Sequence, residues 1–265
     1  MPDLLAAALL GLIQGLTEFL PISSTAHLLL AERVLRLEPA RFGLSFTVAL
    51  HLGTALAVLL YFASTWIGLV RGLLARQWRL PLLIVIGTLP AVVAGLLFQS
   101  SVERELRDPR VVAGGLVAGS VLFYLAERIG SQRRTFGQAG PADALLMGAA
   151  QALALIPGIS RSGVTISAGL ARGLRRGDAT RFSFLLATPV VLGAGAKTLV
   201  DAPRASALLE RPDLLAVGLL VSFASGLAAV AFLVRFLREH SLAAFIAYRL
   251  ALAGGIVVAL LAGAL

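Results

Sequence analysis

The chain has 265 residues, of which 58% are hydrophobic and 14% are charged, a composition that excludes an ordinary soluble domain and predicts an all-α, polytopic membrane protein. The formal net charge of +9 comes from basic residues in short loops between apolar segments, so it indicates membrane topology and not a nucleic-acid partner. No cysteine is present, which excludes disulfides, thiolate catalysis and cysteine-ligated metals.

The first apolar segment, 1–31, is broken at Pro21. Around this break, the run from Gln14 to His27 carries an amide, a carboxylate, four hydroxyls and an imidazole. Polar groups in hydrocarbon are costly unless they are paired, so such a run is a candidate functional site. A broken helix at membrane depth must face protein or a water-filled cavity, and we therefore expect a re-entrant helical hairpin. The first basic residue is Arg33, so we expect this segment to be retained rather than cleaved as a signal peptide.

Six uninterrupted apolar segments are long enough to cross a bilayer, which takes roughly 17–25 residues of helix. They are 42–62, 80–98, 111–127, 182–200, 214–236 and 243–263. Segment 142–171, between the third and the fourth, is broken at Pro157-Gly158, and we expect it to form a second re-entrant hairpin. No linker interrupts the chain, which is expected to form a single membrane domain over 1–265.

The loop charges predict how these segments are oriented. Three loops carry a net charge of +3 each: 63–79, 128–141 and 172–181. Three others carry +1, 0 and −1: 32–41, 99–110 and 201–213. The basic loops fall on one side of the membrane only if each broken segment leaves the membrane on the side from which it entered. The count therefore predicts six spans plus two hairpins, with both termini outside and the hairpin mouths on opposite sides.

The two halves of the chain carry matching features. Pairs that are 137 residues apart are Gly11 and Gly148, Gln14 and Gln151, and Ser23 and Ser160. Pairs that are 131 residues apart are Gly87 and Gly218, and Gly95 and Gly226, and such glycines let helices approach closely. Interrupted segments at corresponding positions indicate a midplane site between inverted repeats, here about 1–130 and 131–265. This arrangement would bring Pro21 and Pro157 together.

The first broken segment carries groups suited to catalysis. Gln14 and Glu18 are four residues apart and share a helix face, where a buried carboxylate among polar groups suits a metal-binding or water-activating role. Ser24 and His27 are three residues apart, within hydrogen-bonding range, which suits a hydroxyl nucleophile beside a base. An attacking imidazole or an oriented water is the alternative. Glu18 and His27 could also be packed hydrogen-bonding groups without a catalytic role.

The second broken segment, Pro157-Gly-Ile-Ser-Arg-Ser-Gly163, has the features of an anion cradle. Its two glycines permit close backbone approach, and a helix N-terminus follows. Arg161 offers a planar, permanently charged fork that suits phosphate oxygens, and nearby serine and threonine hydroxyls are further donors. The alternative is a structural salt bridge from Arg161 to Glu18. Even then, the pair would be the empty form of a site in which Arg161 binds an anion and Glu18 binds a cation.

The two motifs together resemble the bacterial undecaprenyl-diphosphate phosphatase family, also called bacitracin-resistance proteins. The similar residues are Gln-x-x-x-Glu with Pro-Ile-Ser-Ser-Thr-Ala-His, then Pro-Gly-x-Ser-Arg-Ser-Gly-x-Thr, then Phe182-Ser-Phe-Leu-Leu-Ala-Thr-Pro189 and Ala247-Tyr-Arg249. The resemblance implies an integral-membrane phosphatase that converts undecaprenyl diphosphate to the monophosphate and inorganic phosphate, which recycles the carrier lipid for peptidoglycan and gives bacitracin resistance. It also implies a divalent cation (Mg²⁺ or Ca²⁺), homodimers, and a bacterial inner-membrane location with the active site open to the periplasm.

By motif, the resemblance assigns catalysis to Glu18, Ser24, His27 and Arg161, and metal binding to Gln14 with Glu18. The expected substrate contacts are Ser23, Thr25, Gly158, Ser160, Ser162, Gly163 and Thr165. Two positions depart from the family pattern, because Gln14 stands where many members have Glu and Thr47 where an acidic residue is usual. Both departures weaken a two-carboxylate metal site. The alternative function is a secondary transporter or flippase of a phosphorylated lipid, since inverted repeats with broken helices are also a transporter architecture.

Overall fold

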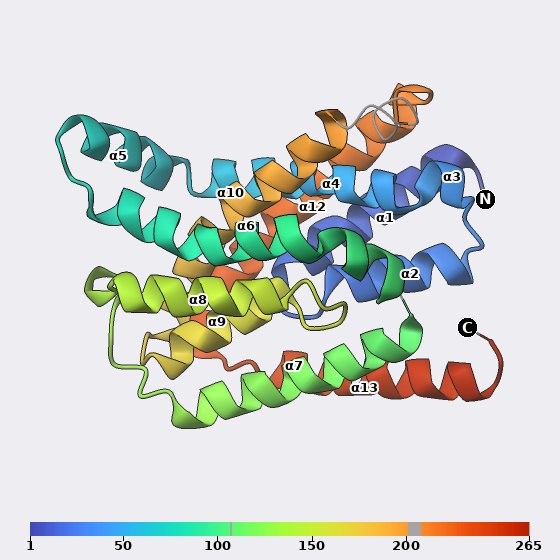
Figure 1. The fold of residues 1–265 in the computed structure, drawn as a ribbon. Helices are drawn as coiled ribbons and strands as arrows, with labels where there is room; N and C mark the ends of the chain where they lie inside the picture. Colours follow the sequence, from blue (N-terminus) through green and yellow to red (C-terminus); the bar gives the residue numbers. More distant parts are fainter. Residues whose placement is uncertain (107, 201–207, 265) are drawn as a thin grey trace.

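The computed structural model describes residues 1–106, 108–200 and 208–264, all within one helical bundle (Figure 1). Its elements in chain order are α1 (Asp3–Phe19), α2 (Ser24–Val34), α3 (Pro39–Phe42), α4 (Leu44–Tyr61), α5 (Ala63–Leu74), α6 (Arg79–Glu105), α7 (Pro109–Ile129), η1 (Phe136–Gln138), α8 (Pro141–Leu153), α9 (Arg161–Ala171), α10 (Arg176–Val200), α12 (Pro212–Glu239) and α13 (Ala243–Leu261). Part of the charge counted in loops 99–110 and 201–213 falls on residue 107 and residues 201–207, which lie outside the described residues.

Within the described residues, six helices are long and apolar enough to cross a membrane, which confirms the predicted number. They cover Pro39–Tyr61, Arg79–Phe98, Pro109–Ile129, Arg176–Thr198, Pro212–Glu239 and Ala243–Leu261. The largest difference is in the fourth span, which begins at Arg176 and not at 182, because Asp178 favours the helix N-terminus in its first turn. The predicted loop 63–79 also contains a helix, α5, which buries none of its residues.

Two shorter helix pairs, α1–α2 and α8–α9, each reverse direction at a break, and the two pairs open toward opposite ends of the bundle (Figure 1). Pro21 ends α1, because the residue before proline disfavours helical backbone and Leu20 is extended. Helix α8 ends earlier, at Leu153, four residues before Pro157. The second helix of each pair begins after Ser23 or Ser160, both at φ 74°, whose side chains accept hydrogen bonds from backbone N–H groups three residues on. That these hairpins re-enter one side of a membrane, and that the halves form an inverted repeat, stay predictions.

Equivalent glycines pack the first helix of each hairpin against one span from the other half of the chain. A Cβ atom on Gly11 of α1 would collide with the Gly218 carbonyl on α12, and one on Gly148 of α8 would collide with the Gly87 carbonyl on α6. The predicted close approach at Gly87 and Gly218 is therefore confirmed. At Gly95 it is wrong, because a Cβ there would have no atom within 4 Å and the residue lines a pocket instead.

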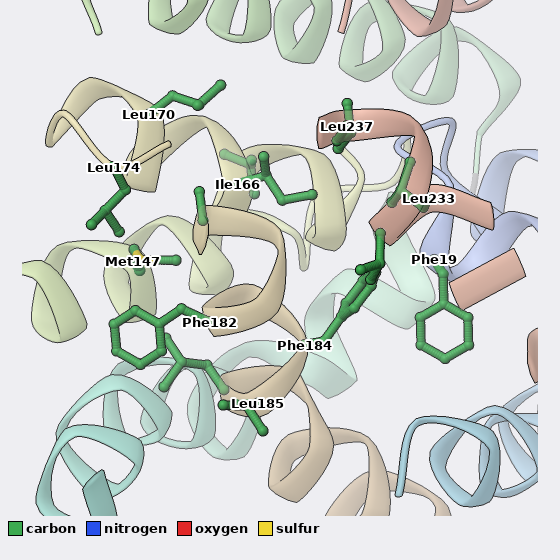
Figure 2. Packing of buried hydrophobic residues seen from close by; sticks show 14 of the residues in the cluster. Phe19, Met147, Ile166, Leu170, Leu174, Phe182, Phe184, Leu185, Leu233 and Leu237 are labelled. Carbon is green, nitrogen blue, oxygen red and sulfur yellow. The ribbon is translucent and has the colours of Figure 1, made fainter. Parts of the chain in front are cut away.

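The main apolar core lies between α8, α9, α10 and α12 and reaches the end of α1 (Figure 2). Phe184 of α10 packs edge-on against Phe19, with ring centroids 5.3 Å apart. Removing a buried phenylalanine side chain typically costs about 3–5 kcal/mol. Because Phe19 directly follows Glu18, this packing fixes the point at which α1 ends.

Charged groups close the mouth of the α8–α9 hairpin. Asp143, in the first turn of α8, accepts hydrogen bonds from both terminal nitrogens of Arg134 at 3.0 and 2.7 Å and from Nε of Arg172 at 2.7 Å. The hydrogen bonds to Asp143 raise the pKa of the Arg134 guanidinium above its ordinary value. Since Arg172 follows directly after α9, the carboxylate of Asp143 ties the two open ends of the hairpin together.

Candidate functional site

Glu18, in the last turn of α1, lies at the centre of a buried polar cluster. Its Oε2 atom accepts hydrogen bonds from Gln14 Nε2 at 3.0 Å and from Ser24 Oγ at 2.7 Å. Its Oε1 atom forms an ion pair with Nη2 of Arg161. The predicted shared face of Gln14 and Glu18 is confirmed, and the carboxylate joins both sides of the first break.

Arg161, the first residue of α9, brings the second hairpin to the same place. The predicted alternative of a salt bridge from Arg161 to Glu18 is therefore present. A second link between the breaks is a hydrogen bond from Ser162 Oγ to the Leu20 carbonyl, at 3.4 Å. The two breaks meet as expected, and a cationic and an anionic side chain face each other where they do.

A pocket of about 180 Å³ opens beside this ion pair. Seven of the predicted site residues line it: Glu18, Ser23, Ser24, Thr25, Gly158, Ser160 and Arg161. They come from both hairpins, although their positions in the sequence are far apart. A cavity where a few polar groups converge is the usual form of a small-ligand site.

Three of the predicted substrate contacts lie outside the lining of this pocket. Thr165 is fully buried, and its hydroxyl donates to the Arg161 carbonyl at 2.7 Å. Gly163 packs against the Phe123 ring, where a Cβ atom would collide, and Ser162 is buried between the breaks. These residues shape the start of α9. Helix geometry turns Ser162 and Gly163 away from the face that carries Arg161, whereas Thr165 shares that face but donates its hydroxyl to the α9 backbone.

His27 lies away from Ser24, and no hydrogen bond in the described residues joins them. The ring of His27 stacks on Tyr248 of α13, with Nδ1 2.8 Å from the Ser23 carbonyl and Nε2 2.7 Å from the Tyr248 hydroxyl. Ser24 is the first residue of α2, and its hydroxyl points back toward Glu18. The i, i+3 spacing correctly predicted that both residues lie near the break. Their hydrogen-bond partners differ from the predicted pairing, because Ser24 contacts Glu18 and His27 contacts Tyr248. In a neutral ring, Nδ1 donates to the carbonyl and Nε2 accepts from Tyr248.

Two residues of the site carried no predicted role. His51 of α4 lines the pocket with its Nε2 atom 3.4 Å from Glu18 Oε2, while its Nδ1 atom lies 2.9 Å from the Thr47 carbonyl. Gln151 of α8 also lines the pocket, and its buried amide has no hydrogen-bond partner within the described protein. An imidazole within an apolar span and the 137-residue offset between Gln14 and Gln151 were the signals that could have identified them.

The oxygen atoms around Glu18 provide the test for a divalent cation. Besides the carboxylate and the Ser24 hydroxyl, the side-chain carbonyl of Gln14 is buried without a hydrogen-bond partner in the described residues. Mg²⁺ and Ca²⁺ prefer oxygen ligands, and Mg²⁺ is often held by one or two carboxylates together with substrate phosphates. Among the described residues, no group of three or more His, Cys, Asp or Glu side chains could hold a metal ion. These three oxygen donors fit a divalent cation only together with phosphate oxygens, which would complete its coordination.

An apolar pocket of about 530 Å³ continues from the polar one and shares seven lining residues with it, among them Thr25, His51 and Leu155. Its walls come from α4, α6 and α10 and are mostly aliphatic, with Thr47 and Lys197 among the few polar residues. A larger pocket of about 720 Å³ lies elsewhere, among the basic residues Arg175, Arg176, Arg181 and Arg238. It contains none of the predicted site residues, so the paired polar and apolar pockets are the candidate site.

Comparison with known proteins shows the family of the chain. Residues 7–256 match the family described as "Bacitracin resistance protein BacA". A protein of Rubrobacter xylanophilus named undecaprenyl-diphosphatase is 45% identical over 98% of this chain and 99% of its own length. Proteins of the same name from Corynebacterium diphtheriae and Myxococcus xanthus are 46% and 43% identical, over 96% and 99% of this chain and 92% and 91% of their own lengths. The chain is therefore a multi-pass membrane protein that belongs to the bacitracin resistance protein BacA family.

Proposed function

We propose that this protein is an undecaprenyl-diphosphate phosphatase that hydrolyses undecaprenyl diphosphate to undecaprenyl phosphate and inorganic phosphate. The observation that carries the proposal is the convergence of Glu18, Ser24 and Arg161 on one small pocket that continues into an apolar one. The names of the similar proteins from Rubrobacter, Corynebacterium and Myxococcus support the choice of substrate. Through this reaction the protein would recycle the carrier lipid for cell-wall synthesis and confer bacitracin resistance.

The two pockets match the two parts of such a substrate. The polar pocket would take the diphosphate, whose charge Arg161 and the hydroxyls of Ser23, Thr25 and Ser160 would stabilise. The amide of Gln151, without a protein partner in the described residues, is a further donor to phosphate oxygen. The apolar pocket would take the first part of the prenyl chain, while the remainder stays in the lipid.

The contact between Ser24 and Glu18 supports a serine nucleophile with Glu18 as its base. When phosphoryl oxygens take over Arg161, the freed Glu18 carboxylate accepts the proton of the Ser24 hydroxyl, which already donates to it at 2.7 Å. Ser24 Oγ then bonds to the terminal phosphorus, and the bond to the bridging oxygen breaks with its electron pair leaving on undecaprenyl phosphate. The proton on Glu18 passes to the leaving undecaprenyl phosphate, which restores the carboxylate. Water then hydrolyses the phosphoserine: its oxygen bonds to phosphorus and releases inorganic phosphate, and one of its protons returns to Ser24 Oγ. His27, held by Tyr248, orients the start of α2 in this scheme.

A divalent cation, Mg²⁺ or Ca²⁺, would be held by Glu18 and Gln14 together with phosphate oxygens. Bound there, it would neutralise charge on the diphosphate. Glu18 is the one carboxylate in this donor set, because Gln14 supplies a neutral carbonyl.

We place the protein in the bacterial inner membrane as a homodimer, with both termini and the polar pocket open to the periplasm. The charge difference between the loops supports the orientation. A reporter that is active only in the periplasm, fused to the C-terminus, should give a signal. A signal from a cytoplasmic reporter would contradict the six-span orientation, and the mass of the purified protein in detergent tests the dimer.

The function is tested with purified protein in detergent, where there is no second compartment to transport into. We expect release of inorganic phosphate from undecaprenyl diphosphate, and loss of that release in Ser24→Ala. Ser64→Ala is the matched control, because this serine is exposed on α5, away from the polar pocket. Substrate binding without phosphate release would favour the transporter or flippase.

A further inference from the structure

A buried arginine without an acidic partner lies between the two hairpin breaks. Arg249, in the middle of α13, is 0% exposed and forms no ion pair within the described residues. Its Nε atom donates to Ser120 Oγ at 3.1 Å, and its guanidinium lies over the Phe123 ring at 4.6 Å. Burying a cation of this kind costs folding free energy unless its N–H groups are hydrogen-bonded. Its remaining hydrogen bonds therefore indicate its structural role.

Those hydrogen bonds reach backbone carbonyls at both breaks. Nη2 donates to the Gly158 carbonyl at 2.8 Å and to the Leu116 carbonyl of α7 at 2.9 Å, and Nη1 donates to the Pro21 carbonyl at 3.4 Å. No backbone N–H in the described residues donates to the carbonyl of Pro21 or Gly158. Because a broken helix leaves its carbonyls without helical partners, one guanidinium satisfies a freed carbonyl in each hairpin.

The two carbonyls occupy corresponding positions in the halves of the chain. Pro21 and Gly158 are 137 residues apart, as are Ser23 and Ser160, which begin the second helix of each hairpin at φ 74°. Arg249 itself belongs to neither hairpin. A single side chain from α13 therefore contacts the same point of both.

Helix α7 provides the space for this arrangement. A Cβ atom on Gly119 would collide with Nη2 of Arg249, and one on Gly115 would collide with the Pro157 carbonyl. The two glycines are four residues apart on one helix face, so α7 presents a side-chain-free strip to the guanidinium and to the second break. The strip lets Arg249 lie between α7 and both breaks.

We propose that Arg249 is a positioning residue that holds the two breaks at the separation at which Glu18 meets Arg161. Pro21 follows Glu18 by three residues and Gly158 precedes Arg161 by three, so a shift of either carbonyl moves one member of the ion pair. Lysine could not replace it, because one ammonium lacks the planar fork that spans several carbonyls. The effect of Arg249 on catalysis rests on the proposed phosphatase function, whereas its effect on the distance between the breaks does not.

The distance between the hairpins tests the proposal directly. The chain has no cysteine, so Leu16→Cys on α1 and Leu153→Cys on α8 give two defined sites for spin labels, and both side chains are exposed and lie outside the two pockets. We expect pulsed electron paramagnetic resonance to show a broader distance distribution in Arg249→Met than in the parent. Arg181→Met is the control, because Arg181 also loses a cation–π contact and one hydrogen bond but contacts neither break. An unchanged distribution in Arg249→Met would overturn the proposal.

Kinetics separate positioning from direct contact with substrate. Misplacement of catalytic groups by about 1 Å can cost about 10²-fold, so we expect kcat of Arg249→Met and Arg249→Lys to fall by about that factor with KM little changed. A higher KM at parental kcat would assign Arg249 to substrate binding and overturn the positioning role. If the parent releases no phosphate, the proposed function fails, and the distance measurement still decides the role of Arg249.

A second variant covers the case in which Arg249→Met does not fold. Gly119→Ala keeps the arginine but places a methyl group where its Nη2 atom lies, and this methyl group would also contact the Ile159 carbonyl of the second break. We expect a broadened distance distribution and a smaller loss of kcat in this variant, measured on material that elutes as a single species by gel filtration. A folded Gly119→Ala protein with the parental distribution would contradict the proposal.

Discussion

Replacing Glu18 with glutamine tests two roles of this carboxylate, as the ion-pair partner of Arg161 and as the general base for Ser24. The substitution keeps the shape of the side chain but removes the charge that pairs with Arg161 and accepts from Ser24. Removing one partner of a buried ion pair typically costs about 3–5 kcal/mol. Because Arg161 keeps a side-chain exposure of 16%, we expect a cost near the lower end, about 3 kcal/mol, in the free energy of unfolding.

The same variant should bind phosphate better than the parent, although it turns over more slowly. In the parent, phosphate must displace Glu18 from Arg161, whereas in Glu18→Gln the guanidinium is free to bind it. The loss of a general base typically lowers kcat by about 10²–10⁴-fold. We therefore expect inorganic phosphate to raise the unfolding temperature of Glu18→Gln more than that of the parent, since a ligand stabilises the state that binds it.

The assay combines phosphate release in detergent with thermal unfolding at increasing phosphate concentrations. Asp143→Asn is the matched control, because Asp143 is also a buried carboxylate paired with arginine but lies at the mouth of the second hairpin. It should be destabilised while its kcat stays near that of the parent. Parental kcat in Glu18→Gln, or weaker stabilisation by phosphate than in the parent, would refute the role given to the ion pair.

Further substitutions test the remaining assignments. Arg161→Lys keeps the charge but loses the bidentate fork, so we expect a strong loss of phosphate release in a folded protein, and near-parental release would reduce Arg161 to a structural role. Gln14→Glu adds a carboxylate to the donor set, and Thr47→Asp adds one on α4, one turn before His51. Either should lower the cation concentration needed for half-maximal activity; no shift in either variant would place both positions outside the metal shell. Ser24→Ala should abolish turnover while His27→Ala keeps part of it, and an acid-labile, base-stable phosphoryl adduct on the parent would instead identify His27 as the nucleophile.

Local spacing predicted those parts of the site that depend on one helix. The hydrogen bond between Gln14 and Glu18 follows from their four-residue separation, and the six spans follow from apolar length. The partner of His27 could not be predicted in this way, because Tyr248 comes from a helix 221 residues later. His51 was missed for the same reason. Its position beside Glu18 depends on how α4 packs, and no periodicity within α4 encodes that contact.

The repeat pattern predicted more than local spacing, because it relates residues that are distant in the sequence. The matching offsets of Gly87 and Gly218 predicted close helix approach, and both glycines lie at such contacts. The pattern could not predict Arg249, since a side chain that contacts both hairpins has no counterpart in the other half. The pattern also predicted a contact that is absent. Gly95 has a matching offset with Gly226, but it lines the apolar pocket and makes no close helix contact.

The size of the apolar pocket has a consequence for the substrates that the protein would accept. At roughly 30 Å³ for each water-sized group, its volume of about 530 Å³ holds on the order of 18 carbon atoms, far fewer than a long prenyl chain contains. Carbons beyond that number would lie in the surrounding lipid in both the free and the bound state, so they would add little to the free energy of binding. Discrimination would then depend on the diphosphate and the first few isoprene units, and a short-chain prenyl diphosphate should be cleaved with a kcat close to that of the long one.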